Sequence, residues 1–480
     1  MRPGTRHAVR LSSVPAGAPG EGHAVVIGAG MAGLLAAHEL AAHYRTVTLV
    51  DRDRMTQTPG FRPGVPQSRH THLLLGRGLE TLELLLPGLV PELIAEGGVP
   101  IDWPGDALWL TPAGWSDRFR PGMSIVSASR DLIEWLVRRR VLAHPRISLL
   151  EATRVTALAA DDSGGRVAGV VVAEGGGKGP RTLAADLVLD ASGRSSAAPQ
   201  WLADLGFPVP EELTAPSDVG YASRFYEQPA CDGDWRLLLL QTRPPRHTRS
   251  GMLLPVDGGR WMVSLVGVNG DHPPTDEKGF LEFARTLRSP VLYDAIRTAR
   301  PLTPIHGFRV PDSRRRRFDR MRARPEGFAV VGDALCSLNP MYAQGMSVAA
   351  MTALALREEL ADGPAHRRLG SRLQNRAARA GSDAWLIASG EDLRYLPPEV
   401  RGRRLPQDRL MTAYFDRVLR TATTDRTVSA ALLRVLNLQS GPYSLVRPGI
   451  VLRALGRKER PPTTTVPAPA VPHAETGSTS

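Results

Sequence analysis

The stretch His23-Ala-Val-Val-Ile-Gly-Ala-Gly-Met-Ala-Gly33 decides the fold of this chain of 480 residues. Its apolar start predicts a buried parallel strand, and residues 34–40 predict the helix that follows. Gly28 permits the tight turn between them, Gly30 lets a pyrophosphate approach the backbone, and Gly33 lets the helix pack on the strand. The stretch therefore predicts a βαβ unit that binds a dinucleotide.

A second strand is expected over Thr46 to Val50, and it ends at Asp51, which lies 23 residues past Gly28. A carboxylate about 20 residues after the first glycine accepts hydrogen bonds from an adenosine ribose. The free N–H groups at the helix N-terminus attract the phosphates. Because strand, turn, helix, strand and acid follow in order, dinucleotide binding is favoured over a plain βαβ unit.

A second Gly-Asp segment extends this prediction. Gly327-Phe-Ala-Val-Val-Gly-Asp-Ala334 reads as another strand with an acid at its end, and Asn339-Pro-Met-Tyr-Ala-Gln-Gly-Met346 leads into a helix. This suits a longer cofactor, with Asp333 on the ribityl hydroxyls of a flavin. A helix that starts near Gly345 would direct its dipole at the flavin ring. The alternative is a turn aspartate that caps a structural helix.

Composition excludes several classes of protein. Lys+Arg 60 against Asp+Glu 48 gives a formal charge of +12, and 57 of the basic residues are Arg, which resembles the bias of a GC-rich genome. Two cysteines cannot form a disulfide scaffold. The first twenty residues lack the apolar core of a signal peptide, and no run approaches the ~18 apolar residues of a membrane span. We therefore expect a cytoplasmic globular protein without a transmembrane segment. The sequence has no helix-turn-helix, zinc-finger or RNP motif and only 5% aromatic residues, so no nucleic-acid partner is expected despite the positive charge.

Periodicity gives a coarse secondary structure. Helices are expected at 78–86, at 130–141 and over most of the chain after Gly345. Strands are expected at 170–173, 183–190, 221–226, 235–241, 251–256, 261–266 and 327–331.

The order of motifs resembles that of the FAD-dependent monooxygenases of the p-hydroxybenzoate hydroxylase fold. The GxGxxG turn is followed by Ser127-Ala-Ser-Arg130, by Asp190-Ala-Ser-Gly-Arg194 and by the Gly332-Asp333 segment. The closer likeness is to bacterial flavin epoxidases of polyether biosynthesis and, more distantly, to squalene epoxidase. It rests on residues 64–72, 255–261, 332–340 and 383–385, and the resemblance spans about 22–455.

The resemblance implies an α/β protein in which a Rossmann-type FAD-binding domain is interleaved with an antiparallel-sheet substrate domain and followed by a C-terminal helical region. FAD-binding parts are expected at 22–105, 127–200 and 306–362. The substrate domain is expected at 106–126 and 201–305, and the helical region at 363–456. Residues 1–21 and 457–480 are expected to be a flexible and a disordered tail.

The resemblance also implies roles for individual residues. The three glycines hold the pyrophosphate, Asp51 binds the adenosine ribose, and Arg130 contacts the adenosine–phosphate part. Members of the family often have Glu where this chain has Asp51, which leaves the charge but changes the reach. The implied FAD-binding set is Gly28, Gly30, Met31, Ala32, Gly33, Asp51, Arg52, Arg130, Asp190, Gly193, Asp333, Pro340, Gly345 and Met346.

The implied reaction is epoxidation of an alkene or polyene in a lipophilic polyketide or terpenoid through a flavin C4a-hydroperoxide, with the flavin itself as the oxidant. NAD(P)H supplies electrons, directly or through a flavin reductase. Three alternatives stay open: hydroxylation of a phenolic polyketide, reduction of a prenyl chain, and flavin binding without turnover. Hydroxylation benefits from a base, for which His70, His72 and Tyr342 are candidates. Flavin halogenases carry a Trp-x-Trp-x-Ile-Pro segment and a catalytic Lys, and this chain lacks that segment.

Four weaker signals have competing interpretations. His70-Thr-His72 lacks companions for a metal site, so we expect no metal. Cys336 is expected to be an inert thiol rather than a covalent flavin link. Arg314 to Arg317 are expected in a solvated loop, or as a docking surface for an acidic carrier protein that bears the substrate. Residues 445–455 either lie on a membrane surface or pack on the body of the protein.

Overall fold

A five-stranded parallel sheet forms the centre of the computed structural model, which describes residues 9–11, 21–174, 179–228, 234–361, 368–396, 406–456 and 465–468. Its strand order is β19-β13-β2-β3-β9, and all of its pairs are parallel. The strands are β2 (His23–Ile27), β3 (Thr46–Val50), β9 (Ile147–Leu150), β13 (Leu187–Asp190) and β19 (Phe328–Val330). This is the predicted Rossmann-type sheet, built from segments more than 300 residues apart.

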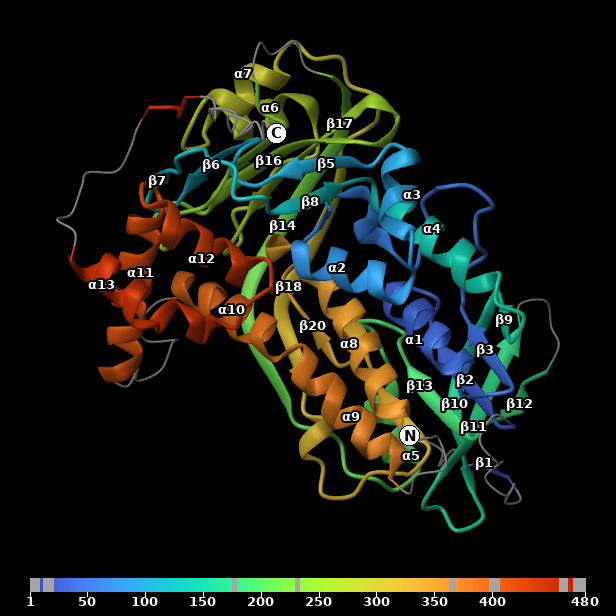
Figure 1. Ribbon diagram of the computed structural model, residues 1–480. Coiled ribbons are helices and arrows are strands. Elements are labelled where there is room, and N and C mark those ends of the chain that lie inside the picture. The colour runs from blue at the N-terminus through green and yellow to red at the C-terminus, as the bar shows by residue number, and fades with distance from the viewer. Residues whose placement is uncertain are drawn as a thin grey trace, which may run out of the picture.

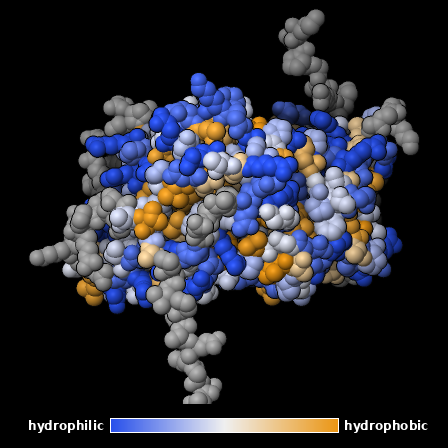
Figure 2. Space-filling model, turned by 90° about the horizontal axis from the view of Figure 1, so that it is seen from above, coloured by the Kyte–Doolittle hydropathy of each residue, from blue (hydrophilic) through white to orange (hydrophobic). Residues whose placement is uncertain are grey.

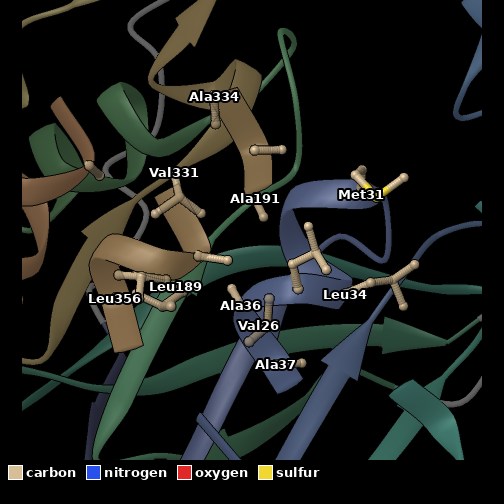
Figure 3. Close-up of a cluster of buried hydrophobic side chains, with 14 of the residues drawn as sticks. Val26, Met31, Leu34, Ala36, Ala37, Leu189, Ala191, Val331, Ala334 and Leu356 are labelled. Atoms are coloured by element: carbon tan, nitrogen blue, oxygen red, sulfur yellow. The ribbon is translucent and has the colours of Figure 1, made fainter. Parts of the chain in front are cut away.

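Different layers cover the two faces of this sheet (Figure 1). One face packs against α1 (Met31–Ala41), α4 (Arg130–Leu142), α8 (Gly345–Leu360) and α9 (Leu369–Ala380). The other contacts a four-stranded sheet ordered β1-β10-β11-β12, made of Val9–Leu11, Thr153–Asp161, Val167–Glu174 and Arg181–Ala184. Figure 3 shows side chains of the core, among them Val26, Leu34, Leu189 and Leu356, gathered between sheet and helices.

The second large layer is an eight-stranded sheet with the order β20-β18-β14-β17-β16-β15-β6-β7. It is antiparallel except where β15 runs parallel to β6. Its strands are β6 (Ala107–Thr111), β7 (Gly114–Trp115), β14 (Glu212–Glu227), β15 (Leu237–Leu240), β16 (Arg249–Val256), β17 (Arg260–Gly267), β18 (His306–Arg316) and β20 (Cys336–Ser337). The four strands predicted between residues 221 and 266 are all present in it, as β14 to β17.

The remaining elements surround these layers. A three-stranded sheet orders β4 (Leu73–Leu74), β8 (Ser124–Ser127) and β5 (Val99–Asp102). Helices α6 and α7 contact β17 and β16 of the eight-stranded sheet. The C-terminal region is helical, as predicted. The helices not yet given bounds are α2 (Gly76–Leu85), α3 (Leu89–Ala95), α5 (Ala198–Asp204), α6 (Glu277–Arg285), α7 (Val291–Ile296), α10 (Ser382–Asp392), α11 (Pro406–Ala422), α12 (Arg426–Leu436) and α13 (Pro448–Gly456).

Three local predictions are wrong. Residues 183–190 form two strands rather than one, because the chain leaves its partner β11 after Ala184 and pairs with β2 and β19 from Leu187. Val9–Leu11, placed in a flexible tail, pairs with β10 as a parallel strand. Arg314 to Arg316 of the Arg cluster lie in β18 and Arg317 follows that strand directly, rather than all four lying in a solvated loop. Nearly all of the tail expected at 457–480 lies outside the described residues.

The C-terminal segment 445–455 packs on the body of the protein. Leu445, Ile450 and Ala454 are buried with residues of α11 and α12, whereas Leu452 and Leu455 are exposed. Within the described residues, no helix has the length and apolar character to cross a membrane. Figure 2 shows hydrophobic residues in small groups between hydrophilic ones on the viewed face.

Candidate functional site

One cavity of about 770 Å³ lies between the parallel sheet and the eight-stranded sheet. It opens beyond the carboxyl ends of β2, β3, β13 and β19, where a Rossmann-type sheet binds its ligand. Of the fourteen residues in the implied FAD-binding set, all line this cavity except Gly33 and Asp190. The structure thus brings together residues from six separate segments of the chain.

The turn at the end of β2 has the geometry that its glycines predict. Gly28 has a φ of +96°, and a Cβ there would lie 2.6 Å from the Ala191 carbonyl oxygen. A Cβ on Gly33 would lie 1.8 Å from the Gly28 carbonyl oxygen, so this glycine packs helix on turn and stays out of the cavity. A Cβ on Gly30 would meet only the Arg62 guanidinium, at 3.8 Å. The N-terminus of α1 therefore opens on the cavity and offers free N–H groups to an anion.

A buried network of charges holds Asp51 beside this turn. Its Oδ2 accepts a hydrogen bond from the Ala29 N–H at 2.7 Å, and its Oδ1 accepts one from the Asp53 N–H at 2.9 Å. Arg62 lies 3.5 Å from Asp51 and 3.2 Å from Asp53, and its Nε donates to Glu134 at 2.7 Å. Oδ2 thus accepts from both Ala29 and Arg62, whereas Oδ1 keeps a lone pair for a ribose hydroxyl. We call Gly28, Gly30, Asp51, Arg62 and Arg130 the dinucleotide wall.

Arg130 belongs to the same network. It begins α4 and donates to Glu134 Oε2 from Nε at 3.2 Å and from Nη2 at 2.8 Å. Burial raises the pKa of Glu134, but Arg130 and Arg62 outweigh it, so the pKa of this carboxyl is lowered overall. Glu134 is therefore ionised at neutral pH and fixes the two guanidiniums.

Sequence reasoning missed Arg62 and Glu134. Only the spacing of four residues between Arg130 and Glu134 on a predicted helix could have indicated their ion pair.

Asp190 supports the cavity from behind. The side chain is fully buried, and its carboxylate accepts hydrogen bonds from the Ser192 N–H at 2.9 Å and from the Ser196 hydroxyl. Burial raises the pKa of this carboxyl. These bonds shape the loop in which Gly193 adopts a φ of +85° and lines the cavity. Asp190 therefore acts on the predicted cofactor site indirectly, through the loop that carries Gly193.

The second Gly-Asp segment lies against the start of α1, where a Cβ on Gly332 would be 2.6 Å from the Ala32 Cβ. Asp333 faces the cavity. Burial raises the pKa of its carboxyl, and the positive charges of Arg130 and Arg194 oppose this rise. Helix α8 begins at Gly345, as predicted, and Pro340, Gly345 and Met346 line the cavity beside it. Both acids and both helix N-termini therefore face one space, which fits a cofactor with two phosphates and a polyhydroxyl chain.

A buried carboxylate holds the loop before α8. Asp392, 1% exposed, accepts hydrogen bonds from Ser313 Oγ, Asn339 Nδ2 and Tyr342 OH, each at 2.8 Å. Burial raises the pKa of Asp392 to about 6, against these three hydrogen bonds, which lower it. No motif pointed to Asp392, because its partners come from β18 and from a loop 50 residues away.

The far side of the cavity is apolar and comes from the eight-stranded sheet. Phe308, Tyr221 and Val266 lie opposite one another on β18, β14 and β17, so they form one row across three strands. Leu239 and Met252, paired on β15 and β16, extend the lining. These five residues are called the apolar wall. His70 packs against it, with ring centroids 5.6 Å from Tyr221 and 5.5 Å from Phe308.

The three candidate bases do not titrate near neutral pH. Burial lowers the pKa of His70 to about 3, and burial lowers that of His72 to about 4. Burial and the nearby Asp392 raise the pKa of Tyr342 well above its usual range. Tyr342 also lies outside the cavity lining. A general base works best with a pKa near the operating pH, so these groups are poorly suited to ionising a phenol.

The structure bears on the predictions for Cys336 and for a metal site. Cys336 is buried, lies outside the cavity lining, and has a thiol pKa that burial raises to about 12. Among the described residues, no group of three or more His, Cys, Asp or Glu side chains is arranged to hold a metal ion.

The Arg cluster is bound within the protein. Arg316 and Arg317 pair with Glu212 and Asp319, and Arg315 donates to the Ala378 carbonyl. Arg316 is buried, whereas Arg314, Arg315 and Arg317 are partly exposed, so docking of an acidic carrier protein stays a prediction.

Comparison with known proteins places these features in a family. The FAD-binding domain family matches residues 21–374. Protein Rv3254 of Mycobacterium tuberculosis (strain ATCC 25618 / H37Rv) is 30% identical over 470 residues, which cover 93% of this chain and 98% of that protein.

Solved structures share the fold at low sequence identity. The flavin-dependent brominase Bmp2 matches with a TM-score of 0.64 and 16% identity, over 90% of this chain and 98% of that one. The p-nitrophenol 4-monooxygenase PnpA from Pseudomonas putida DLL-E4 matches with a TM-score of 0.61 and 17% identity, over 88% and 99%.

Proposed function

This chain belongs to the FAD-binding domain family, and from that premise we propose that it is an FAD-dependent monooxygenase that epoxidises an alkene or polyene of a lipophilic natural-product intermediate. The observation that carries the proposal is a cavity with two unlike sides. The dinucleotide wall suits the cofactor, and the apolar wall suits a hydrocarbon substrate. NAD(P)H is the proposed electron donor, directly or through a flavin reductase.

The protein's part in this reaction is to bind, orient and exclude water. The α1 N-terminus would hold the pyrophosphate, Asp51 the adenosine ribose, and Asp333 the ribityl chain, with the α8 N-terminus at the ring. FAD, when bound, supplies the redox chemistry that activates oxygen. Tyr221, Val266 and Phe308 keep the far side of the cavity dry, which protects reactive species from water.

The pKa values of the cavity side chains support epoxidation over phenol hydroxylation. Adding oxygen to an alkene requires no proton to be removed from the substrate, whereas a phenol reacts best when a base ionises it. His70 and His72, with pKa values near 3 and 4, are weak bases at neutral pH. Halogenation lacks support, because no Lys lines the described cavity and Lys278 is exposed on α6.

Product analysis under ¹⁸O₂ tests this function. The purified protein with FAD and NADPH is incubated with polyene and phenol substrates, with and without a flavin reductase. We expect one ¹⁸O atom to be added across an alkene, and no product without oxygen. Anaerobic reduction of the alkene would instead identify a prenyl-chain reductase, and ring oxygenation would identify an aromatic hydroxylase. Absence of any turnover on all substrates would favour flavin binding alone.

Matched variants connect the activity to the cavity. Asp333→Asn removes the charge that faces the cavity, so we expect FAD to bind about tenfold more weakly, as is typical for loss of a charge-assisted hydrogen bond. Asp204→Asn on the exposed end of α5 is the control and should bind FAD like the wild type. Flavin fluorescence titration measures both. Equal affinities in the two variants would remove Asp333 from the proposed site.

A further inference from the structure

Two serines of the eight-stranded sheet lie on the side that faces the cavity. Ser223 on β14 is directly opposite Ser264 on β17, two residues along from the pair Tyr221 and Val266. Alternate residues of a strand point to the same face, so both serines share the face of the apolar wall. Each is fully buried, and their hydroxyl oxygens are hydrogen-bonded to each other. They are polar groups beside the apolar wall, and Ser250, opposite Val266 on β16, is a third serine that lines the cavity.

These serines connect the loop before β4 to the sheet. The Thr71 N–H donates to Ser264 Oγ at 3.1 Å, and Ser223 Oγ lies 2.8 Å from His70 Nδ1. The resulting chain of atoms runs from Thr71 N through Ser264 and Ser223 to the imidazole. It fixes the ring of His70 relative to the cavity through a path in which every member is hydrogen-bonded.

The direction of these bonds follows from counting hydrogens. Each hydroxyl has one hydrogen to donate. Among the residues that the structure describes, Ser264 Oγ has two neighbours, the donor Thr71 N–H and Ser223. Its hydrogen must therefore go to Ser223, because otherwise a buried hydroxyl would lack an acceptor. The Ser223 hydrogen then goes to His70 Nδ1, so the neutral imidazole carries its hydrogen on Nε2.

The Nε2 edge of His70 opens on the cavity. His70 is a lining residue, and within the described part of the chain Nε2 has no hydrogen-bond partner and is not one of the fully buried unpartnered side-chain atoms. We propose that His70 is a fixed hydrogen-bond donor that presents Nε2–H to an acceptor oxygen on an otherwise apolar substrate. This deepens the proposed function and rests on it. It narrows the substrate class from plain hydrocarbons to alkenes that carry a carbonyl, ether or hydroxyl oxygen.

Burial keeps the imidazole of His70 neutral. Burial is the main cause of the lowered pKa, followed by His72, His306 and Arg69, all of which disfavour a second proton. The rings of Tyr221 and Phe308 complete its surroundings. A neutral donor in an apolar pocket discriminates strongly, because a ligand without an acceptor leaves a desolvated N–H without a partner. His70 is thus a substrate-positioning residue rather than an acid or a base.

The tautomer can be measured without any turnover. ¹⁵N-histidine-labelled, FAD-loaded protein is examined by NMR between pH 5 and 8, and His70→Gln assigns the signal. We expect a neutral ring with hydrogen on Nε2 throughout. Ser223→Ala should spread the hydrogen over both nitrogens, whereas the matched Ser250→Ala, which removes a cavity serine bonded to the Leu240 carbonyl, should leave the tautomer unchanged. Hydrogen on Nδ1 in the wild type, or titration of His70 in this range, would overturn the proposal.

Binding of matched probes tests the substrate class. Geranylacetone and the hydrocarbon that lacks its carbonyl are titrated against the FAD-loaded protein by flavin absorbance. We expect the ketone to bind about tenfold more tightly, the typical value of one hydrogen bond. His70→Phe should abolish the difference and His70→Gln should restore part of it.

Two outcomes contradict this substrate class. One is equal binding of both probes to the wild type. The other is a His70 signal that shifts on FAD loading and not on ketone addition, which would assign the donor to the flavin. Failure of oxygen transfer alone would contradict the proposed function and leave the His70 tautomer in place.

Discussion

Different interactions hold the side chains on the two sides of the cavity. The dinucleotide wall is charged: Arg62 contacts three carboxylates, and Arg130 binds one of the same three, all of them buried. The apolar wall has no ion pair and is a row of side chains in register across strands. Its one hydroxyl, on Tyr221, donates to Asn339 Oδ1, and the neighbouring hydroxyls of Ser223 and Ser264 connect to His70.

The difference indicates which interactions each side can lose. Buried charges are stable only while each keeps its partner, since an isolated buried ion is costly. An apolar row loses only contact area when one member changes. The dinucleotide wall should therefore fail as a unit and the apolar wall residue by residue. The predictions below test this contrast, starting with the largest expected effect.

Gly33→Ala should disrupt the dinucleotide wall completely. The new Cβ would lie 1.8 Å from the Gly28 carbonyl oxygen, so the turn and α1 must separate. We expect a loss of stability of about 4 kcal/mol, above the usual cost of overpacking because the clash involves backbone, and loss of FAD binding. The control is Gly390→Ala, where a Cβ meets nothing within 4 Å on exposed α10. It should raise stability by about 0.5–1 kcal/mol. Urea unfolding measures both.

Arg62→Met should leave Asp51, Asp53 and Glu134 without their common partner. We expect a loss of about 3 kcal/mol at pH 7, the lower end for breaking a buried ion pair. Arg285→Met, which removes an exposed pair with Glu282, should leave the melting temperature unchanged. A small effect at Arg62 would mean that the two sides of the cavity are equally tolerant.

The Arg62 effect should depend on pH with a defined sign. The wild-type pKa of Glu134 is lowered, so its contribution to stability is present above the unfolded pKa and is lost as pH falls through the folded pKa. In the variant the carboxylates gain stability when they are protonated. The difference in unfolding free energy between wild type and variant should therefore shrink from pH 7 toward pH 4. A difference that grows toward acid would contradict the charge network.

Asp392→Asn tests the carboxylate that holds the loop before α8. Burial raises its pKa from 3.8 to about 6, so the protonated form is favoured in the folded state. The stability from this group is present below the unfolded pKa and is lost as pH rises through about 6. The variant should gain about 3 kcal/mol relative to the wild type between pH 3.5 and pH 7. Asp204→Asn, on exposed α5, should show no such trend in the same unfolding series.

The smallest effect is expected at Cys336. Its thiol is buried, has a pKa raised to about 12, and lies outside the cavity lining. Acid precipitation should therefore release all FAD into the supernatant, as measured by absorbance. Cys336→Ala should bind FAD like the wild type and lose about 1 kcal/mol or less. Flavin that stays with the precipitated wild type but not with the variant would show a covalent link.

The features that could be predicted from the sequence are those that residues close together in the chain determine. The turn from Gly28 to Gly33 and the acid at Asp51 follow from backbone geometry within 30 residues, so the sequence motif predicts them. Asp392 has no such pattern, because Ser313, Asn339 and Tyr342 reach it from other elements. The Arg cluster was expected in a loop because its charge suggested solvent, whereas Arg316, Arg315 and Arg317 have partners on β14, on α9 and in a neighbouring turn.

The sequence by itself determined the α/β class, the flavin-type motif order and most of the residues around the cofactor cavity. These follow from short-range rules: glycine where backbones meet, apolar runs where strands are buried, and acids where strands end. Only the tertiary structure decided which residues neutralise Asp51, which carboxylate holds the loop before α8, and which ring nitrogen of His70 faces the cavity. Those facts depend on strand register and on side chains that meet from different elements, up to 153 residues apart in the case of His70 and Ser223, and no local pattern encodes them.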